Sequence, residues 1–489
     1  MKSEKLMDAI GIIGDDLIAG AKKKNNSKRK PLLAGIAAML ILVLGFSAVW
    51  GRLFPSTQIS MPPDPPTTPS GVDTIAPSSP GNLGLQNLIA APTYPQVAQY
   101  SNEQYDLWKE FQIHWETLYG LPDGYLNNLK DFFAESAVQC LSGEGNQVYS
   151  PSSVYFSLAM LAECTDGNSQ KEILKLLGVT NIEQLRSQAK RLWLASYKAD
   201  GKTSCIFSNS VWIDDQLSYN TETAQYLADQ HYASVFHGDL GTTQMNEQLQ
   251  TWLNAMTGNL LYDQANAVQM DSSTALALVS TLYFQANWKD PFLEKNTYTG
   301  IFHSSRGETQ VQFLFADGSQ GASDYFWSEQ YTAVCRPLAD EQNLWLILPN
   351  EGCTPKMLLQ DDQWLTMVLN KEKWQQQKHT NLELSVPKFD ICSRMDLIES
   401  LKKLGITNIF DGKTANFSPI TSDANIRVQE FDQATRVLID EFGVSGASYA
   451  RPFIYFSTAE VKLTLDRPFL FVITTADGLP LFVGIVEQP

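Results

Sequence analysis

The stretch VKLTLDRPFLFVITTADGLPLFVGIV (461–486) near the end of the chain predicts the fold more strongly than any other segment. It holds three short apolar runs, at 461–465, 468–474 and 479–486, which are rich in Val, Leu, Ile and Phe. Runs of this length, separated by turn residues, are typical of β-strands buried in a sheet. The sequence therefore predicts that the chain ends in three consecutive strands.

The part of the chain before this stretch mixes two kinds of periodicity. Further apolar runs predict strands at 206–213, 276–284, 343–349 and 382–389. Apolar residues at helical spacing predict helices at 126–141, 155–166, 170–178 and 395–405. Because the strands do not alternate regularly with the helices, we expect mixed or antiparallel sheets with segregated helices, which is an α+β fold.

Six motifs between residues 125 and 489 resemble, in order and spacing, the landmarks of the serpin family. They are NQVYSPSS (146–153), ALALVSTLYFQANWKDPF (275–292), GIFHSSRGETQVQFL (300–314), VPKFDI (386–391), LGITNIFDGKTANFS (404–418) and LTLDRPFLFVI (463–473). The resemblance implies the serpin fold, with three β-sheets, about eight or nine helices and an exposed reactive-centre loop. It also implies a protease inhibitor and not an enzyme.

The resemblance further implies a group of side chains that hydrogen-bond beneath the main sheet, where that sheet must open. In this chain the corresponding residues are Asn146, Ser150, Ser153, Ser280, Gln433 and Trp288. Serpins usually carry Asn at the position of Ser280 and often His at the position of Gln433. Ser and Gln still donate and accept hydrogen bonds, so they can substitute in such a network.

In serpins a protease attacks the reactive-centre loop as a substrate, and the cut loop then inserts into the main sheet as a new strand. About fifteen residues at roughly 3.3 Å each carry the trapped protease on the order of 50 Å. The corresponding loop here is EFGVSGASYARPFIYFSTAE (441–460). The family pattern assigns its hinge to Glu441, Gly443, Val444, Gly446 and Ala447.

The alternation of residues along the loop suits insertion, since a strand buries every second residue. If Val444 faces inward, the other inward residues are Gly446, Ser448, Ala450, Pro452, Ile454 and Phe456. None of them is charged, and Arg451 falls on the outward face. The pattern favours a loop that inserts after cleavage.

The scissile bond is expected among Tyr455, Phe456, Ser457 and Thr458. Counting seventeen residues from Glu441 gives cleavage after Ser457, and counting back from the strand at 461 gives cleavage after Tyr455 or Phe456. These side chains favour a chymotrypsin-, elastase- or subtilisin-like serine protease as the target. A papain-like cysteine protease is the alternative target.

Two features of the loop count against inhibition. The hinge reads Val-Ser-Gly-Ala-Ser-Tyr, which only partly matches the alanine-rich run of inhibitory serpins. Pro452 lacks the amide N–H that an interior strand uses, and one missing ladder bond costs about 1 kcal/mol. The alternative function is therefore a non-inhibitory, serpin-fold adhesion or interaction module at the cell surface.

The residues before 125 predict a membrane anchor and a spacer. Residues 31–54 contain 21 consecutive uncharged positions, enough to span a bilayer as a helix, and basic residues concentrate before them in 1–30. Residues 55–95 carry ten prolines and predict a disordered linker, and 96–124 predict a helical lead-in. We expect a single-pass protein of the cell membrane, with a cytoplasmic N-terminus and the domain 125–489 outside the cell.

Composition excludes several other classes of function. The net charge of −17 argues against a nucleic-acid partner. The six cysteines form no CxxC pair, and no HExxH or GxSxG motif occurs, so we expect no metal, no cofactor and no catalytic residues. We expect free thiols, with one or two disulfides as the alternative, and a monomer whose partner is the target protease.

Overall fold

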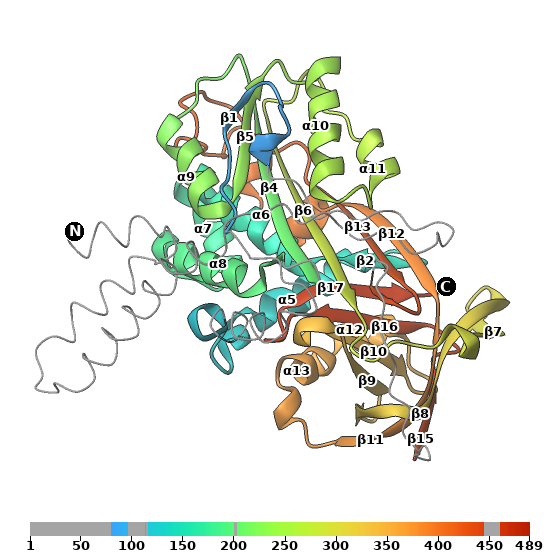
Figure 1. Ribbon diagram of the computed structural model, residues 1–489. Helices are drawn as coiled ribbons and strands as arrows, with labels where there is room; N and C mark the ends of the chain where they lie inside the picture. The colour runs from blue at the N-terminus through green and yellow to red at the C-terminus, as the bar shows by residue number, and fades with distance from the viewer. Residues whose placement is uncertain (1–79, 96–112, 114–115, 200–202, 445–459) are drawn as a thin grey trace, which may run out of the picture. The chain divides into compact units, whose positions relative to one another are not determined.

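A computed structural model describes residues 80–95, 113, 116–199, 203–444 and 460–489. The described residues form a mixed α+β structure with two hydrogen-bonded strand networks (Figure 1). Helices lie on both faces of the eight-stranded network, which is called the main sheet below. This agrees with the α+β fold expected from the sequence. All six cysteines are free thiols.

The main sheet has eight strands and carries the features relevant to function. Its order is β1 (Leu88–Ala90), β5 (Ala233–Gly238), β4 (Thr203–Asp214), β6 (Leu276–Asn287), β14 (Gly443–Val444), β13 (Asp432–Ile439) and β12 (Phe389–Asp396), and β3 (Lys198–Ala199) pairs with β4. The two-residue strand β14 is antiparallel to both of its neighbours, so β6 and β13 run parallel to each other.

The second network accounts for the other two sheets expected from the sequence. Its order is β15 (Val461–Thr464), β11 (Gln377–Pro387), β8 (Gly307–Trp327), β9 (Tyr331–Pro337), β10 (Asn343–Pro349), β16 (Phe469–Thr474), β17 (Pro480–Val486) and β2 (Gln147–Tyr149), and β7 (Tyr298–Ser304) pairs with β8. β8 is 21 residues long and takes part in both sheets of this network. Its first part pairs with β7 and its last part with β9, so one continuous strand joins two sheets.

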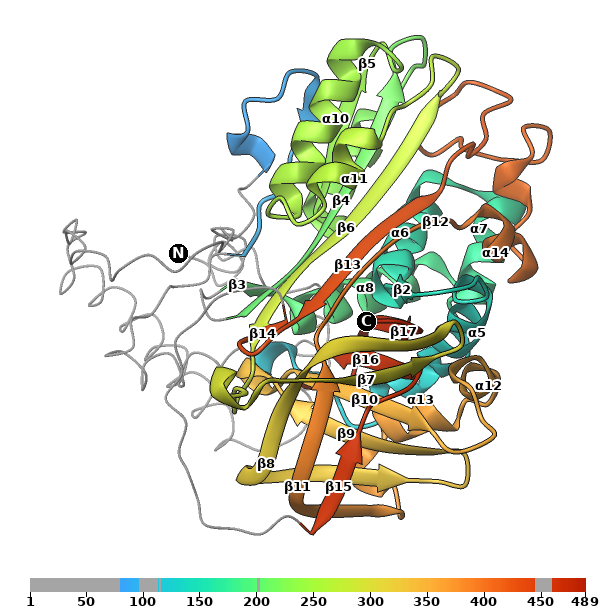
Figure 2. The same ribbon diagram turned by 90° about the vertical axis from the view of Figure 1, so that its right-hand side faces the viewer.

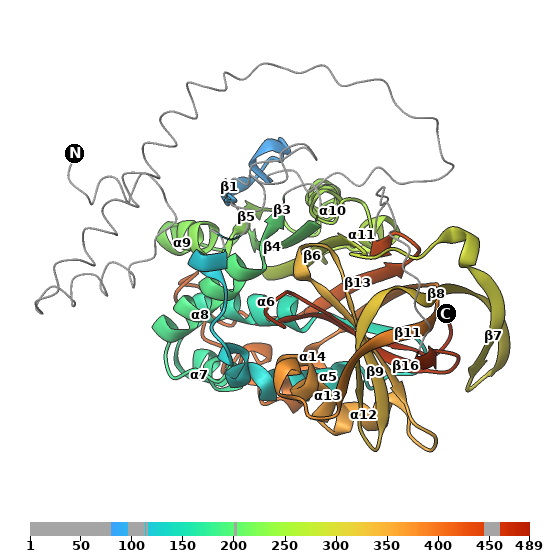
Figure 3. The same ribbon diagram turned by 60° about the horizontal axis from the view of Figure 1, so that its bottom comes forward.

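Ten α-helices lie wholly within the described residues, where about eight or nine were expected, and residues 116–119 belong to a further one. The ten are α5 (Lys130–Cys140), α6 (Pro151–Cys164), α7 (Gly167–Leu176), α8 (Ile182–Ser196), α9 (Thr221–His231), α10 (Thr243–Met256), α11 (Tyr262–Ala267), α12 (Pro355–Gln360), α13 (Gln363–Leu369) and α14 (Ile398–Lys403). α10 and α11 lie on one face of the main sheet and α6 on the other (Figure 2). α5, α12, α13 and α14 gather at the end of the molecule seen in Figure 3.

Helix α6 forms the centre of the core. Ser150 caps its N-terminus by accepting a hydrogen bond from the amide of Ser153, and Pro151 suits the first turn because its missing N–H would have no partner there. All 14 residues of α6 are buried, because the helix packs against both β6 and β17. A helix that is apolar all round is stable only when it is covered on every side.

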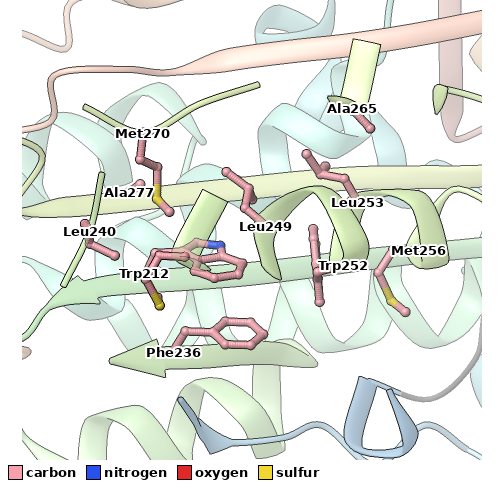
Figure 4. Close-up of a cluster of buried hydrophobic side chains, with 11 residues drawn as sticks. Trp212, Phe236, Leu240, Leu249, Trp252, Leu253, Met256, Ala265, Met270 and Ala277 are labelled. Atoms are coloured by element: carbon pink, nitrogen blue, oxygen red, sulfur yellow. The ribbon is translucent and has the colours of Figure 1, made fainter. Parts of the chain in front are cut away.

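A cluster of large apolar side chains fixes α10 to the main sheet (Figure 4). Trp252 and Leu249 of α10 pack with Trp212 of β4 and Phe236 of β5, and all four are buried. The Trp212 and Phe236 rings stack with their centroids 3.9 Å apart. Burial of several aromatic side chains in one place makes this a major contribution to the stability of the sheet.

The end of the expected linker is folded, which corrects the prediction of a disordered segment up to residue 95. Residues 88–90 form β1, which pairs antiparallel with β5 at the edge of the main sheet. Leu83, Leu85 and Leu88 pack against the cluster around Trp252. The physical reason is that these three leucines supply apolar surface to bury, which the proline-rich residues before them do not.

The predicted location at the cell membrane is also corrected. Within the described ranges no helix is long and apolar enough to cross a membrane. A spanning helix needs about 20 apolar residues, whereas the longest helix there, α8, has 15 residues and a strongly polar face. The segment 31–54, on which the predicted anchor rested, lies outside the described residues. Most of 96–124 lies outside them too.

Tyr94 offers a test of how much the folded segment 80–95 contributes to stability. Its ring stacks on Trp193 and Tyr232, with centroids 5.9 and 6.0 Å away, and its hydroxyl donates to Ser208 Oγ at 3.1 Å. We expect Tyr94→Ala to lower the free energy of unfolding by about 2 kcal/mol. Tyr94→Phe, which removes only the hydroxyl, should cost about 1 kcal/mol. Urea unfolding of the three proteins measures both values, and an unchanged midpoint for Tyr94→Ala would contradict the packing role.

Candidate functional site

The candidate site is the junction between β13 and β14, where the reactive-centre loop expected from the sequence would begin. β13 ends at Ile439, and Asp440 turns the chain by accepting hydrogen bonds on Oδ1 from the amides of Phe442 (2.8 Å) and Gly443 (3.1 Å). Burial raises the pKa of Asp440, and these two amides partly oppose that shift. The turn sends Gly443 and Val444 back between β6 and β13 as β14.

Glu441 anchors the hinge through an ion pair between its buried carboxylate and the partly exposed ammonium of Lys388. Its Oε2 lies 2.7 Å from Lys388 Nζ, and its Oε1 accepts a hydrogen bond from Thr297 Oγ1 at 2.8 Å. The side chain is 6% exposed, so burial alone would raise its pKa. The hydrogen bonds from Lys388 and Thr297 outweigh burial and hold the pKa of Glu441 below its usual value. The hinge is thereby tied to the start of β12 and to the residues before β7.

The backbone of the hinge is held by the segment that follows β6. The amide of Trp288 donates to the carbonyl of Phe442 (2.9 Å), and the amide of Phe292 donates to the carbonyl of Glu441 (3.2 Å). The indole Nε1 of Trp288 donates to the carbonyl of Asp440 at 2.8 Å. Three consecutive hinge carbonyls, at 440, 441 and 442, are therefore bound by two residues of one short segment.

Glycine is required at position 443 because the junction leaves no room for a side chain. A Cβ at this position would lie 2.3 Å from the carbonyl oxygen of Ala286 and 2.7 Å from the Cα of Asn287. Val444 follows with its side chain buried, at 2% exposure. The strand thus enters the sheet with a small residue at the closest contact and an apolar side chain facing the core.

Below β14 the main sheet contains a groove between β6 and β13. Its cavity volume is only about 20 Å³, and its lining includes Ser150, Ser153, Ser280, Phe284, Gln433 and Thr435. Figure 2 shows β14 between the ends of the two long strands. Among the described residues, β6 and β13 are joined through β14 alone. The sheet is therefore joined at one end and open along the rest of the groove.

Four residues of the predicted sheet-opening network meet at the floor of this groove. The amide of Ser150 donates to Gln433 Oε1 (2.8 Å), and Gln433 Nε2 donates to the carbonyl of Ser150 (2.9 Å). Ser150 Oγ and Ser153 Oγ lie 2.9 Å apart. Ser280 Oγ is 3.5 Å from the carbonyl of Ser153, which is a weak contact. These contacts connect α6 with the two strands that border the groove.

The other two residues assigned to this network lie elsewhere, which corrects that grouping. Trp288 lies at the hinge, for the reasons given above. Asn146 precedes β2 and accepts on Oδ1 from the amides of Glu487 and Gln488, both at 2.8 Å, so it holds the C-terminal residues. Sequence proximity to Ser150 does not place Asn146 in the groove, because β2 lies between them and pairs with β17 at the C-terminus.

Several residues of the predicted loop lie outside the described part of the chain. They are Gly446 and Ala447 of the hinge and the scissile candidates Tyr455, Phe456, Ser457 and Thr458. Sequence reasoning missed Lys388, Thr297 and Asp440, which hold the hinge. The one signal for a partner available in the sequence was the carboxylate of Glu441, in a hinge expected to enter a sheet. A carboxylate that becomes buried needs a cationic partner.

The described residues contain one group of carboxylates close enough to suggest a metal site, at Asp214, Asp215 and Asp239. Both oxygens of Asp214 already accept backbone hydrogen bonds, from the amides of Gln216 (3.1 Å) and Leu240 (3.1 Å). The other two residues are exposed. The cluster stabilises the turn after β4 and carries no functional argument.

The ion pair of Glu441 makes a pH-dependent prediction. Because the pKa of Glu441 is lower in the folded than in the unfolded protein, its stabilising contribution is present above the unfolded value of about 4.3. It is lost as the pH falls through the folded pKa. We expect the urea midpoint of the native protein to fall more steeply below about pH 4.5 than that of Glu441→Gln. Asp440 is present in both proteins, and the charge of Glu441 is only a lesser cause of its raised pKa, so most of its opposite effect is shared. Equal pH slopes would contradict the assignment.

Comparison with known proteins identifies the fold. Residues 128–489 match the family model described as Serpin (serine protease inhibitor). Plasminogen activator inhibitor 1 of Sus scrofa is 26% identical over 364 residues, covering 71% of this chain and 88% of that protein. Neuroserpin of Homo sapiens is 25% identical over 362 residues, covering 70% of this chain and 86% of that protein.

A solved structure shows the same fold. The native state of tengpin, a thermophilic serpin, superimposes with a TM-score of 0.68 at 19% sequence identity, covering 85% of this chain and all of that chain. The family model covers about three quarters of the chain, and the names of the relatives point to an inhibitor and not to an enzyme. The chain belongs to the serpin family.

Proposed function

We propose that this protein is a suicide-substrate inhibitor of serine proteases, which it traps by inserting its cleaved loop between β6 and β13. The observation that carries this proposal is the groove described above. β14 already occupies the first two positions of an additional strand, and the groove continues from it. The inhibitor family and the inhibitor relative named above support protease inhibition as the general function.

The register of β14 predicts where each inserted residue would lie. Val444 pairs with Ala286 of β6 and with Ile439 of β13. Antiparallel pairing advances one residue at a time on each strand, so Gly446 would lie between Phe284 and Val437. Both of these side chains are buried, at 3% and 1% exposure. A residue without a side chain suits the space between them.

Further along the same register, the inserted residues would meet the floor of the groove. Ala450 would lie between Ser280 and Gln433, which line the groove together with Ser150 and Ser153. A methyl group can cover these polar contacts without breaking their hydrogen bonds. The inward residues of the loop therefore match the chemistry of the positions that they would occupy.

Pro452 is the one unfavourable position in this register. The carbonyl of Phe442 accepts from the amide of Trp288, so even-numbered loop residues direct their backbone groups toward β6. Pro452 would lie opposite Leu278, whose carbonyl would lose its ladder bond. One missing bond costs about 1 kcal/mol, and each of the neighbouring inserted residues adds a bond of similar strength. We expect slower insertion and not a complete block.

The target class follows from the scissile region proposed between Tyr455 and Thr458. Aromatic residues followed by a small polar residue suit chymotrypsin-, elastase- or subtilisin-like enzymes, and papain-like cysteine proteases are the alternative. Arg451 lies too near the hinge to leave a full-length strand for insertion, which argues against a trypsin-like target.

The proposal predicts a covalent complex. The full-length protein, mixed with chymotrypsin, pancreatic elastase, subtilisin or papain, should give a band at the summed mass that survives boiling in detergent, with cleavage between Tyr455 and Thr458. Cleavage of the loop by these proteases without such a band, for all four of them, would contradict the inhibitor proposal.

Two neighbouring substitutions provide a matched control for this experiment. Gly446→Glu would place a carboxylate between Phe284 and Val437, where burial costs several kcal/mol. Ala447→Glu would place the same charge on the outward face. We expect Gly446→Glu to be cleaved without forming the complex, and Ala447→Glu to form it. Equal behaviour of the two variants would contradict the proposed register.

A further inference from the structure

Arg336 is a buried cation behind the hinge. It lies near the end of β9 and is 4% exposed. Its hydrogen-bond acceptors are neutral: Nη2 donates to the carbonyl of Asp290 at 2.7 Å, and Nη1 lies 3.4 Å from Ser323 Oγ. Its Nε is buried without a partner among the described residues. Burial lowers the pKa of this guanidinium, and the negative charge of Asp290 only partly opposes the shift.

A charge in this position is costly, because the interior replaces water with few compensating contacts. A methionine, which is shorter but similar in volume, would fill most of the same space without that cost. Two contacts fix the orientation of the Arg336 guanidinium. It lies 5.0 Å from the centre of the Phe292 ring, and it donates a hydrogen bond to the carbonyl of Asp290. Both contacts fall on one short segment of the chain.

That segment, Trp288 to Phe292, is the one that holds the hinge. Its amides at 288 and 292 donate to the carbonyls of Phe442 and Glu441. On its other side it is attached to the end of β9, where the amide of Lys289 donates to the carbonyl of Pro337 at 3.1 Å and Trp288 bridges to Leu338. The segment 288–292 therefore contacts Arg336 through Asp290 and Phe292, and it binds the hinge through its amides at 288 and 292.

We propose that Arg336 is a positioning residue for the hinge: it fixes residues 288–292 so that their amides retain Glu441 and Phe442 until the loop is cut. This rests on the proposed function, because retention matters only if the loop inserts. It is distinct from the ion pair of Glu441 with Lys388, which holds the hinge through the side chain of the residue between β11 and β12.

Amide hydrogen exchange on the uncleaved full-length protein tests this proposal. The amides of Trp288, Lys289 and Phe292 are the donors in question, and β4 serves as an internal reference. We expect Arg336→Met to exchange at least about tenfold faster at these three amides, with β4 unchanged. Arg336→Lys, which keeps a cation but not the planar fork, should restore protection in part.

The matched control is Arg394→Met. It removes an exposed arginine of β12 that is paired with Asp432 of the neighbouring strand β13. It should leave exchange at 288–292 unchanged. Equal protection in Arg336→Met and the native protein would overturn the proposal. So would faster exchange spread uniformly over β4 and the segment, because that would show a general loss of stability. If Arg336→Met does not fold, the Lys variant decides, and full native protection in it overturns the positioning role.

This readout is independent of whether the loop inserts. The same variants, assayed for the detergent-stable complex, separate the two ideas. Absence of the complex in the native protein overturns the inhibitor proposal, while the exchange rates still decide whether Arg336 positions the hinge.

Discussion

The structure depends on an incomplete main sheet. β6 and β13 run parallel, and the strand that would join them is present for only two residues, Gly443 and Val444. Backbone N–H and C=O groups inside a protein need partners, and a strand of the right length and register would supply them along the whole groove. The native arrangement therefore leaves a large number of favourable contacts unmade. The residues around the hinge keep it in that state.

The hinge is held by contacts that approach it from several elements. Lys388 and Thr297 bind the carboxylate of Glu441, and Trp288 and Phe292 bind the backbone beside it. At the floor of the groove, Gln433 exchanges two hydrogen bonds with the backbone of Ser150. Under the proposed function, the first group would retain the loop and the second would keep the strands in place over α6. In that case, moderate changes in either group would shift the balance toward insertion.

The sequence predicted the fold well where apolar residues marked the strands. β4, β6, β10, β16 and β17 all coincide with the apolar runs. β13 was missed, because its buried side chains begin with Gln433 and Thr435, which are polar where they line the groove. Polar residues at these positions remove the apolar alternation by which a strand is recognised in a sequence.

Other features could not be read from the sequence because they depend on distant contacts. Lys388 and Glu441 are 53 residues apart along the chain, and no local pattern joins them. The leucines at 83, 85 and 88 follow a proline-rich stretch, and only the exposed edge of β5 and the cluster around Trp252 explain why they fold. Asn146 lies close to Ser150 in sequence but binds the C-terminal residues instead.

The central claim is that the groove accepts the cleaved loop. The most direct measurement is thermal unfolding, followed by circular dichroism, of the intact protein and of the protein cut once between Tyr455 and Thr458. If the cut loop becomes a full strand between β6 and β13, the new ladder bonds should raise the unfolding temperature by tens of degrees, on the order of 20 °C or more. An unfolding temperature that does not change on cleavage would contradict the account.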